Sequence, residues 1–286
     1  MKYQTYTINK PYDSIYFFLK QNGFSENYIK NLRKTLGNFV VNDEVCTIRK
    51  QLNIGDTLKI NSSPNNKTNI QSCILPLDVV FEDEYYLLIN KPSGISCMPN
   101  RSHYTNNLAG AIMAYMQDKD LNFVVRIINR LDKDTAGIII VAKDSISQKE
   151  IKNIDKTYYA ICDGVIDKPL TIDKPIKTVT NNGINDRKRI IAPDGQSATT
   201  FAKPIQNNGK NTLVSLKLIN GRTHQIRLHM SSIGHPLLGD ELYGEKSDRL
   251  SHTALVCKEI SFYHPYLQQE LKFEIDLPDD FKKILP

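Results

Sequence analysis

The segment INRLDKDTAGIIIVAK, residues 128–143, joins a polar loop to an apolar strand. The loop carries two acidic and two basic side chains and ends at Gly137, and residues 138–142 are hydrophobic enough for a strand buried on both faces. A carboxylate in such a loop is anchored by the sheet yet open to a ligand. Such a carboxylate, Asp132 or Asp134, suits nucleophilic or general-base chemistry, because it stays ionised at neutral pH while a neighbouring guanidinium holds its orientation. The alternative is a turn in which Asp132 and Asp134 bind only backbone N–H groups.

A second long motif, GRTHQIRLHMSSIGHPLLGDELYG, occupies residues 221–244. Thr223 is the expected helix cap and Gly234 the expected stop, which predicts a helix of about ten residues. His224 and Arg227 then lie one turn apart on a face next to the buried stripe. For Arg227 alone, a surface cation is the alternative interpretation.

Three common enzyme signatures are absent from the sequence: the G-x-x-x-x-G-K-[ST] loop, the G-x-G-x-x-G turn and the H-E-x-x-H helix. Energy-coupled, dinucleotide-dependent and zincin chemistry are therefore disfavoured. His224, His229 and His235 are separated by five and six residues, a spacing that does not place three ligands on one helical face. We expect no metal site.

Around these motifs, from Leu75 onward, the sequence alternates many short strand-type runs with a few helices. Helices are expected near residues 107–117 and 145–153, and an exposed loop at residues 181–186. This order predicts an α+β domain built on antiparallel sheet.

Charge is distributed unevenly along the 286 residues, whose formal net charge is +6. Residues 1–72 hold 10 Lys plus Arg against 5 Asp plus Glu, a net charge of +5, whereas residues 73–286 hold 27 against 26, a net charge of +1. A polar, turn-forming run at residues 61–69 separates the two parts. The expected division is a basic domain, a linker and a larger domain, at residues 1–62, 63–74 and 75–286.

The basic part contains a predicted helix that Ser25 caps and Gly37 stops. Its apolar face is expected to consist of Ile29, Leu32 and Leu36. Its cations are Lys30, Arg33 and Lys34. Three cations on a rigid element suit phosphate groups, and a solvated face is the alternative.

Residues 39–45 predict two strands joined by a turn at Asn42 and Asp43, and residues 54–60 predict a further strand. With the basic helix, this order resembles the S4 RNA-binding domain over about residues 8–61. That family usually has Gly at the position of Asp43, but Asn and Asp tolerate the left-handed turn. The resemblance implies a small α/β domain that grips structured RNA.

The two long motifs are similar to those of the RluA-type family of RNA pseudouridine synthases. The family pattern HRLDxxTSGLLLxAK matches residues 129–143, and GRTHQIRxHLxxxGHPLLGDxLYG matches residues 221–244 almost whole. Shorter matches are NKPxG, KxYxAxVxG and FxHP, at residues 90–94, 156–164 and 262–265. The resemblance implies the pseudouridine synthase fold, a largely antiparallel, bent mixed sheet with flanking helices.

The resemblance also assigns roles to five residues. Asp132 is implied as the catalytic carboxylate, with Arg227 pairing with it. Arg130 is implied to fill the gap in the RNA when the target uridine flips out. Tyr158 is implied to stack on the flipped base, and Leu238 to line the apolar wall of the base pocket.

Three positions depart from the family pattern. Asn129 and Val256 stand where the family usually has His, and Ala136 replaces Ser. Because Asn can still form local hydrogen bonds, we expect Asn129 to tune the loop without abolishing activity.

Taken as a whole, the resemblance implies a cofactor-free isomerase that converts specific uridines in RNA to pseudouridine. The S4-like domain favours large-subunit ribosomal RNA as the substrate. Two alternatives are a transfer RNA substrate and a non-catalytic RNA-binding factor in ribosome assembly. In the second, Asp132 is dispensable and the basic helix carries the function.

The five cysteines are scattered with no C-x-x-C pair, which fits a reducing cytoplasm. The N-terminus lacks an apolar signal core, and the longest aliphatic run, residues 138–142, is far shorter than the roughly 20 residues of a membrane span. We expect a cytoplasmic protein that acts on RNA as a monomer, without a membrane partner.

Overall fold

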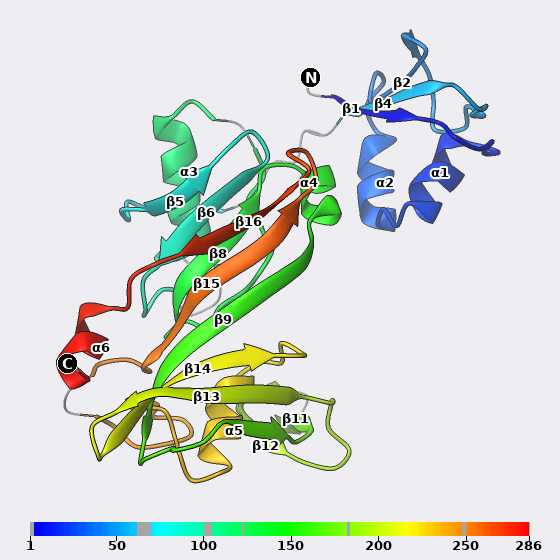
Figure 1. Cartoon of the computed structure of the whole chain (residues 1–286). Helices are drawn as coiled ribbons and strands as arrows, with labels where there is room; N and C mark the ends of the chain where they lie inside the picture. The colour runs from blue at the N-terminus through cyan, green and yellow to red at the C-terminus, as the bar shows by residue number, and fades with distance from the viewer. Residues whose placement is uncertain are drawn as a thin grey trace.

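The structure is a computed structural model that describes residues 3–61, 70–99, 105–121, 123–181, 184–247 and 250–285. Figure 1 shows a small N-terminal part beside a larger, sheet-rich part. The N-terminal part has its own four-stranded sheet in the order β1-β4-β2-β3 and its own buried core. Its elements are β1 (Tyr3–Thr7), α1 (Ile15–Gln21), α2 (Glu26–Leu32), β2 (Phe39–Val41), β3 (Glu44–Val45) and β4 (Thr57–Asn61).

Two predictions for the N-terminal part are confirmed, the helix cap at Ser25 and the hairpin turn at Asn42 and Asp43. The Ser25 hydroxyl accepts a hydrogen bond from the Tyr28 N–H at 3.3 Å and caps α2. Asn42 and Asp43 have φ angles of 50° and 68°, so the pair forms the left-handed hairpin turn without a glycine.

The prediction for Leu36 is wrong. Helix α2 ends at Leu32, with Arg33 as its C-cap, instead of continuing to Gly37. Ile29 and Leu32 are buried as expected, but Leu36 lies beyond the helix and is 79% exposed. The helical spacing no longer applies once the chain leaves the helix.

The larger part is built on a ten-stranded mixed sheet whose central path is β10-β13-β14-β9-β15-β8-β6-β5, with β16 beside β15 and β7 beside β8. The β15–β8 pair is parallel, and the other pairs between its described strands are antiparallel. The α+β prediction is confirmed. The strands are β5 (Asp78–Glu82), β6 (Tyr86–Lys91), β7 (Arg126–Ile127), β8 (Ala136–Ala142), β9 (Lys152–Asp163), β10 (Leu170–Asp173), β13 (Thr199–Asn207), β14 (Asn211–Leu218), β15 (Leu255–His264) and β16 (Gln269–Glu274).

Strands β9 and β15 run through both halves of this sheet, and their pairing is interrupted twice by register shifts. Such irregularities bend a strand pair. In Figure 1 the upper half carries β5, β6, β8 and a helix, and the lower half carries β13, β14 and another helix. The helices of the larger part are α3 (Leu108–Asp118), α4 (Ser145–Glu150), α5 (Gln225–Ser231) and α6 (Asp279–Ile284).

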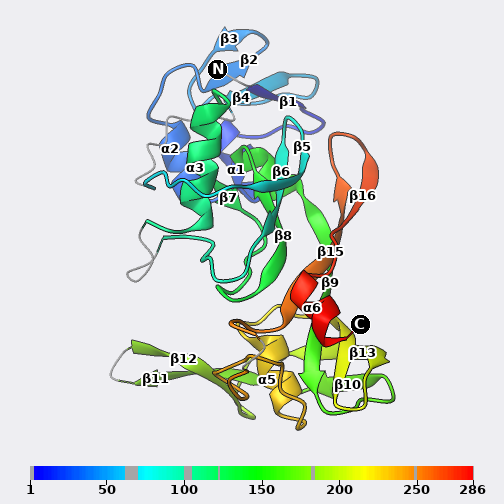
Figure 2. The same ribbon diagram turned by 90° about the vertical axis from the view of Figure 1, so that its left-hand side faces the viewer.

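A two-stranded hairpin, β11 (Ile176–Asn181) and β12 (Ile184–Ile191), forms a separate sheet. It extends away from the lower half on the left of Figure 2. The loop predicted at residues 181–186 includes residues 182–183, which lie outside the described part, and strand residues on either side of them. The helix predicted at residues 145–153 is shorter, because β9 already begins at Lys152.

Gly137 is required where the polar loop enters β8. It pairs with Cys257 of the parallel neighbour β15 and has a φ angle of 118°. A Cβ atom at this position would clash with the Cys257 backbone. Glycine is therefore the residue that lets β8 and β15 approach at the end of the Asp132 loop.

Helix α4 joins the two parts of the molecule. The Ile146 side chain of α4 is fully buried in the core of the N-terminal part, and the Lys149 ammonium lies 3.7 Å from the centre of the Phe24 ring. Most of the predicted linker, up to residue 69, lies outside the described residues. By Cys73, whose N–H donates to the Gly110 carbonyl at 3.1 Å, the chain already packs on α3. Among the described residues, every helix is too short or too polar to span a lipid bilayer.

Candidate active site

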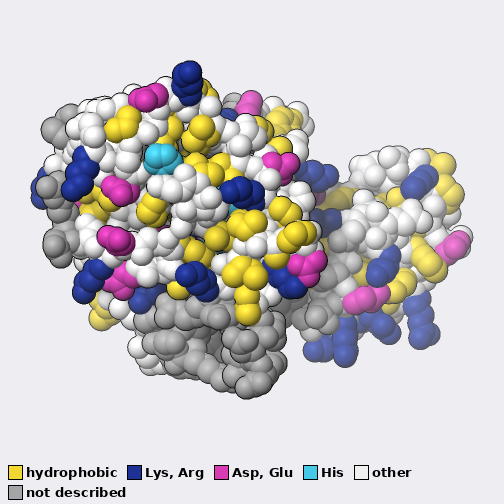
Figure 3. Space-filling view, turned by 90° about the horizontal axis from the view of Figure 1, so that it is seen from below, with side chains coloured by type: hydrophobic (Ala, Val, Ile, Leu, Met, Phe, Trp, Pro, Cys, Tyr) yellow, Lys and Arg dark blue, Asp and Glu magenta, His cyan; other side chains and the backbone are white. Residues whose placement is uncertain are grey.

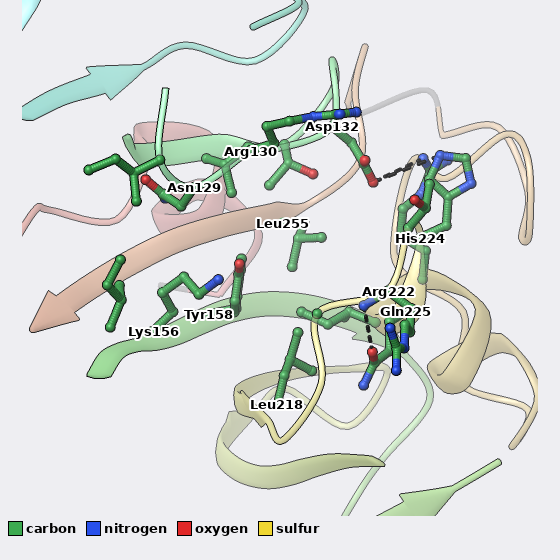
Figure 4. Close-up of a pocket in the computed structure, with 18 residues that line it drawn as sticks. Asn129, Arg130, Asp132, Lys156, Tyr158, Leu218, Arg222, His224, Gln225 and Leu255 are labelled. Carbon is green, nitrogen blue, oxygen red and sulfur yellow. Dashed lines mark hydrogen bonds and ion pairs between the residues drawn. The ribbon is translucent and has the colours of Figure 1, made fainter. Parts of the chain in front are cut away.

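A pocket of about 450 Å³ lies where the Asp132 loop, β9, the end of β14 and the start of α5 meet (Figure 4). It brings together the two long motifs, which are about ninety residues apart in the chain. Its volume is typical of small-molecule sites. The predicted site residues among its lining are Arg130, Asp132, Tyr158 and Arg227.

The Asp132 carboxylate points toward α5, as Figure 4 shows. One of its oxygens lies 4.0 Å from Nη1 of Arg227 and 3.9 Å from Nε2 of His224. The side chain is 32% exposed, so the carboxylate remains accessible from the pocket.

Arg227 approaches Asp132 as expected, but its main partner is a residue that sequence reasoning missed. Its Nε and Nη2 donate to the two carboxylate oxygens of Asp240 at 2.7 Å and 2.6 Å. Asp240 is completely buried and also accepts the N–H groups of Leu242 and Tyr243. This bidentate pair holds the guanidinium beside Asp132 and leaves Nη1 to face the Asp132 carboxylate. The GHPLLGD run of the second motif contains Asp240 and was the available signal.

The start of α5 differs from the prediction. The helix begins at Gln225, and its N-cap is His224, which has a left-handed backbone with φ 57° and no side-chain cap. Thr223 is therefore not the cap, and the helix has seven residues. His224 faces Asp132 across the pocket, a proximity that helical spacing alone did not indicate.

Tyr158 lies on β9 with its side chain in the pocket and is 7% exposed. Burial raises the pKa of the Tyr158 phenol well above its ordinary value, and nearby Cys257 and Asp132 add to the shift. The ring therefore presents a neutral, apolar face to a bound molecule.

Leu238 does not line this pocket, which corrects the prediction for that residue. Its backbone is hydrogen bonded to Ile161 and Ala254, and its side chain packs against a separate apolar cluster. The apolar wall of the pocket is made by Leu218, Leu255 and Ile226 instead. The Leu237 side chain packs in the main core. The side chain of the next residue, Leu238, packs on the separate cluster instead of facing the pocket.

Cations surround the single carboxylate of the pocket. Arg130 is exposed at the rim, and Lys156 and Arg222, which sequence reasoning did not single out, line the same pocket. These three form a positively charged rim around Asp132, whereas Arg227 lies deeper and is paired with Asp240. Such a rim suits an anionic substrate such as a nucleic-acid backbone.

The Asp132 loop is also anchored from below by Lys91, the lysine of the NKPxG match. Its ammonium is fully buried and donates to the carbonyls of Pro92, Ile95 and Lys133 at 2.9, 2.9 and 3.1 Å. Burial lowers the pKa of Lys91 to about 8. A buried ammonium that contacts Lys133 restricts the loop on which Asp132 sits.

Asn129 supports the same loop through two buried hydrogen bonds. Its Nδ2 donates to the Ile138 carbonyl at 2.9 Å, and its Oδ1 accepts the Ile140 N–H at 2.7 Å. The side chain thus continues the β7–β8 ladder for one more residue. Val256, the other departure, is buried in an apolar cluster and pairs with Ala136.

We expect Asn129→Ala to destabilise the protein by about 2–3 kcal/mol, because it leaves a buried N–H and a buried carbonyl without partners. Urea unfolding measures the difference. The exposed Gln148→Ala variant on α4 is the control and should change stability by less than about 0.5 kcal/mol. Equal stability of the two variants would show that the Asn129 bonds contribute nothing.

Comparison with known proteins adds to this geometry. The sequence pattern described as RNA pseudouridylate synthase matches residues 85–232. A protein of Bacillus subtilis strain 168 named as an uncharacterized RNA pseudouridine synthase is 35% identical over 272 residues, which are 92% of this chain and 95% of that protein. The ribosomal large subunit pseudouridine synthase D of Zymomonas mobilis is 34% identical over 230 residues, 73% of this chain and 71% of that protein.

A solved structure with a similar fold is human RNA pseudouridylate synthase domain containing 1. It superposes with a TM-score of 0.57 at 22% identity and covers 74% of this chain and 86% of that one. This likeness concerns the fold. The span matched by the family pattern includes Asp132, Tyr158 and Arg227, and it ends before Asp240 and Tyr243.

Proposed function

The chain belongs to the RNA pseudouridylate synthase family, and we propose that it isomerises specific uridines of large-subunit ribosomal RNA with Asp132 as the catalytic carboxylate. The enzyme is an isomerase, since its family converts uridine to pseudouridine within RNA. The observation that carries the assignment of Asp132 is its position in the pocket, beside Arg227 and open to a substrate. The ribosomal substrate is supported by relatives named as ribosomal large subunit pseudouridine synthases.

In the proposed reaction, the bond between ribose C1′ and uracil N1 breaks and a bond between C1′ and C5 forms. The C5 proton is released, and N1 gains a proton. Asp132 acts at C1′ or on a sugar proton while the uracil turns. The atoms balance without an oxidant, a reductant or a transferred group, so the proposal includes no cofactor.

The pocket offers a place for a flipped uridine. Tyr158 supplies a flat ring for stacking, and Leu218 and Leu255 supply apolar walls. Arg130, exposed at the rim, is positioned to enter the space that the base leaves in the RNA. Removing a base from its stack costs a few kcal/mol, which these contacts offset.

We further propose that residues 1–62 form an S4-like domain that binds RNA phosphates. Lys30, Arg33 and Lys34 are all exposed, at the end of α2 and in the turn after it. In Figure 3 basic side chains gather along one edge of the N-terminal part, at the right, whereas basic and acidic side chains are interspersed on the larger part. The N-terminal part contacts the larger part through α4. RNA bound to the N-terminal part would therefore lie next to the larger part.

A triple variant, Lys30→Gln with Arg33→Gln and Lys34→Gln, neutralises the three cations. It should bind RNA more weakly, and its binding should depend less on salt concentration. If each cation contacts one phosphate, the slope of log K against log salt becomes shallower by about 2–3, because fewer counterions are released. Filter binding of ribosomal RNA fragments at several salt concentrations measures it.

A matched control neutralises three exposed lysines of the larger part, namely Lys168, Lys210 and Lys283. The same change of slope in both variants would mean that only total charge matters, which contradicts a binding face on the N-terminal part. Deleting residues 1–62 is a poorer test, because the deletion exposes Ile146.

The substrate is tested by mapping carbodiimide-modified pseudouridines in RNA from cells with and without the protein. Loss of signal from large-subunit ribosomal RNA supports the proposal, and loss from transfer RNA alone overturns its substrate. We propose that the enzyme works as a monomer in the cytoplasm. Its five cysteines are free thiols, which suits a reducing compartment.

A further inference from the structure

His224 has a backbone conformation that non-glycine residues seldom adopt. Its φ and ψ angles are 57° and 18°, in the left-handed region. Such a conformation costs about 1–3 kcal/mol and persists where the surroundings hold it. The residue lies at the pocket, and its left-handed backbone precedes the first residue of α5.

Both ring nitrogens of His224 face a partner. Nε2 lies 3.9 Å from the Asp132 carboxylate, and Nδ1 lies 3.0 Å from the hydroxyl of Tyr243. The His224 and Tyr243 rings meet edge to face, with centroids 5.6 Å apart and planes at 79°. Figure 4 shows the imidazole directed at Asp132.

The hydroxyl of Tyr243 has a second partner, on β12. The Arg189 backbone N–H, on β12, donates to the Tyr243 oxygen at 2.7 Å. When the phenol proton goes to Nδ1 of His224, the imidazole proton is on Nε2, the nitrogen that faces Asp132. The relay runs from the β12 backbone through Tyr243 and His224 to the carboxylate.

The other neighbour of Asp132, Arg227, is mainly bonded to Asp240. Arg227 gives Nε and Nη2 to Asp240, and only Nη1 approaches the catalytic carboxylate. An Nε2–H on the second side, 3.9 Å from the carboxylate oxygen, attracts the carboxylate electrostatically without adding a full positive charge.

We propose that His224 is a positioning residue for the Asp132 carboxylate, held in its Nε2–H form by Tyr243. This inference rests on the proposed catalytic role of Asp132. Because Arg189 belongs to β12, the relay also ties the β11–β12 hairpin to the active site. The charged groups that face His224 are Asp132, Arg227, Arg189 and Asp240. Burial lowers the pKa of His224 below its ordinary value, which keeps the ring neutral, and Asp132 partly opposes this shift.

Tyr243→Phe tests the relay because it keeps the ring contacts and removes the hydroxyl. We expect kcat to fall about tenfold, the effect of one lost hydrogen bond, with KM unchanged. Without the hydroxyl that favours neutral Nδ1, the pKa of His224 rises, so the acid limb of the pH profile of kcat moves to higher pH. Single-turnover tritium release on a ribosomal RNA fragment, from pH 5 to 8, measures both.

His224→Asn separates the side chain from the backbone. Asn tolerates the left-handed conformation, but its shorter side chain does not reach Asp132. The variant should melt within a few degrees of wild type, lose activity about tenfold or more and lack the acid limb due to His224. The matched control is Tyr115→Phe, which removes a hydroxyl on α3 that donates to Glu82 of β5 and should leave kcat and the profile unchanged.

The inference is overturned if Tyr243→Phe and His224→Asn both keep the wild-type kcat and acid limb. It is also overturned if Tyr115→Phe reproduces their effects. Either result, with Asp132→Asn inactive, leaves the proposed function standing. An active Asp132→Asn enzyme overturns the proposed function itself, so the two failures are distinguishable.

Discussion

Asp132→Asn should reduce tritium release from 5-tritiated uridine in ribosomal RNA by at least about 10⁴-fold, which is the scale seen when an enzyme loses its nucleophile or base. Asparagine has nearly the shape of aspartate but carries no charge and is neither a nucleophile nor a base at neutral pH. The fold should survive, because the side chain is partly exposed and its neighbours His224 and Arg227 are 3.9 Å and 4.0 Å away.

The control for this variant is Asp134→Asn in the same loop. Asp134 is half-buried and does not line the pocket. Its substitution should change the rate by no more than a few-fold. Wild-type tritium release by Asp132→Asn would exclude the mechanism and favour a non-catalytic RNA-binding factor. Circular dichroism confirms that both variants are folded.

Asp240→Asn should have the largest effect on stability, a loss of about 3–5 kcal/mol in urea unfolding. The substitution leaves the Arg227 guanidinium buried without a matching charge, and an unpaired buried charge is costly. Activity should fall as well, since the guanidinium then has no anchor that holds Nη1 beside Asp132. The same sample gives both measurements.

Asp155→Asn is the matched control, since it breaks the ion pair with Lys217 at the surface. Both of these side chains are more than half exposed, so the loss should be below about 1 kcal/mol. Equal losses for Asp155→Asn and Asp240→Asn would contradict the structural role of the buried pair.

The combined variant Arg227→Gln with Asp240→Asn separates stability from catalysis. With no buried charge left unpaired, part of the stability lost in Asp240→Asn should return. Activity should stay low, because no guanidinium faces Asp132. Recovery of activity together with stability would show that Arg227 serves the fold alone.

Turns and helix caps of this fold could be predicted from the sequence, because they depend on single side chains. The hairpin at Asn42 and Asp43 follows from the φ angles that these residues tolerate, and the cap at Ser25 follows from its hydroxyl. Leu36 was misplaced because spacing indicates a face only while the helix lasts, and the end of α2 depends on what the next residues pack against.

Some residues of the candidate site could likewise be predicted from the sequence and others could not. Asp132, Arg130 and Arg227 come from the two long motifs and Tyr158 from the shorter KxYxAxVxG match, and all four line one pocket. Leu238 was misplaced because a motif names a residue without specifying which side of a turn its side chain occupies. Local spacing does not indicate the buried partner of Arg227, which depends on how the turn at Asp240 folds back onto α5. Nor does it indicate the approach of His224, which depends on the left-handed backbone at the start of α5.

The α+β class follows from the short-range pattern of the sequence, and the motifs that resemble the family point to Asp132 as the candidate catalyst. The pairing of Arg227 with Asp240, the link from β12 through Tyr243 to His224 and the packing of Ile146 between the two parts are visible only in the folded molecule. These contacts join segments that are distant in the chain or that fold into separate parts. Their distances follow from strand register and turn direction, which no local spacing encodes.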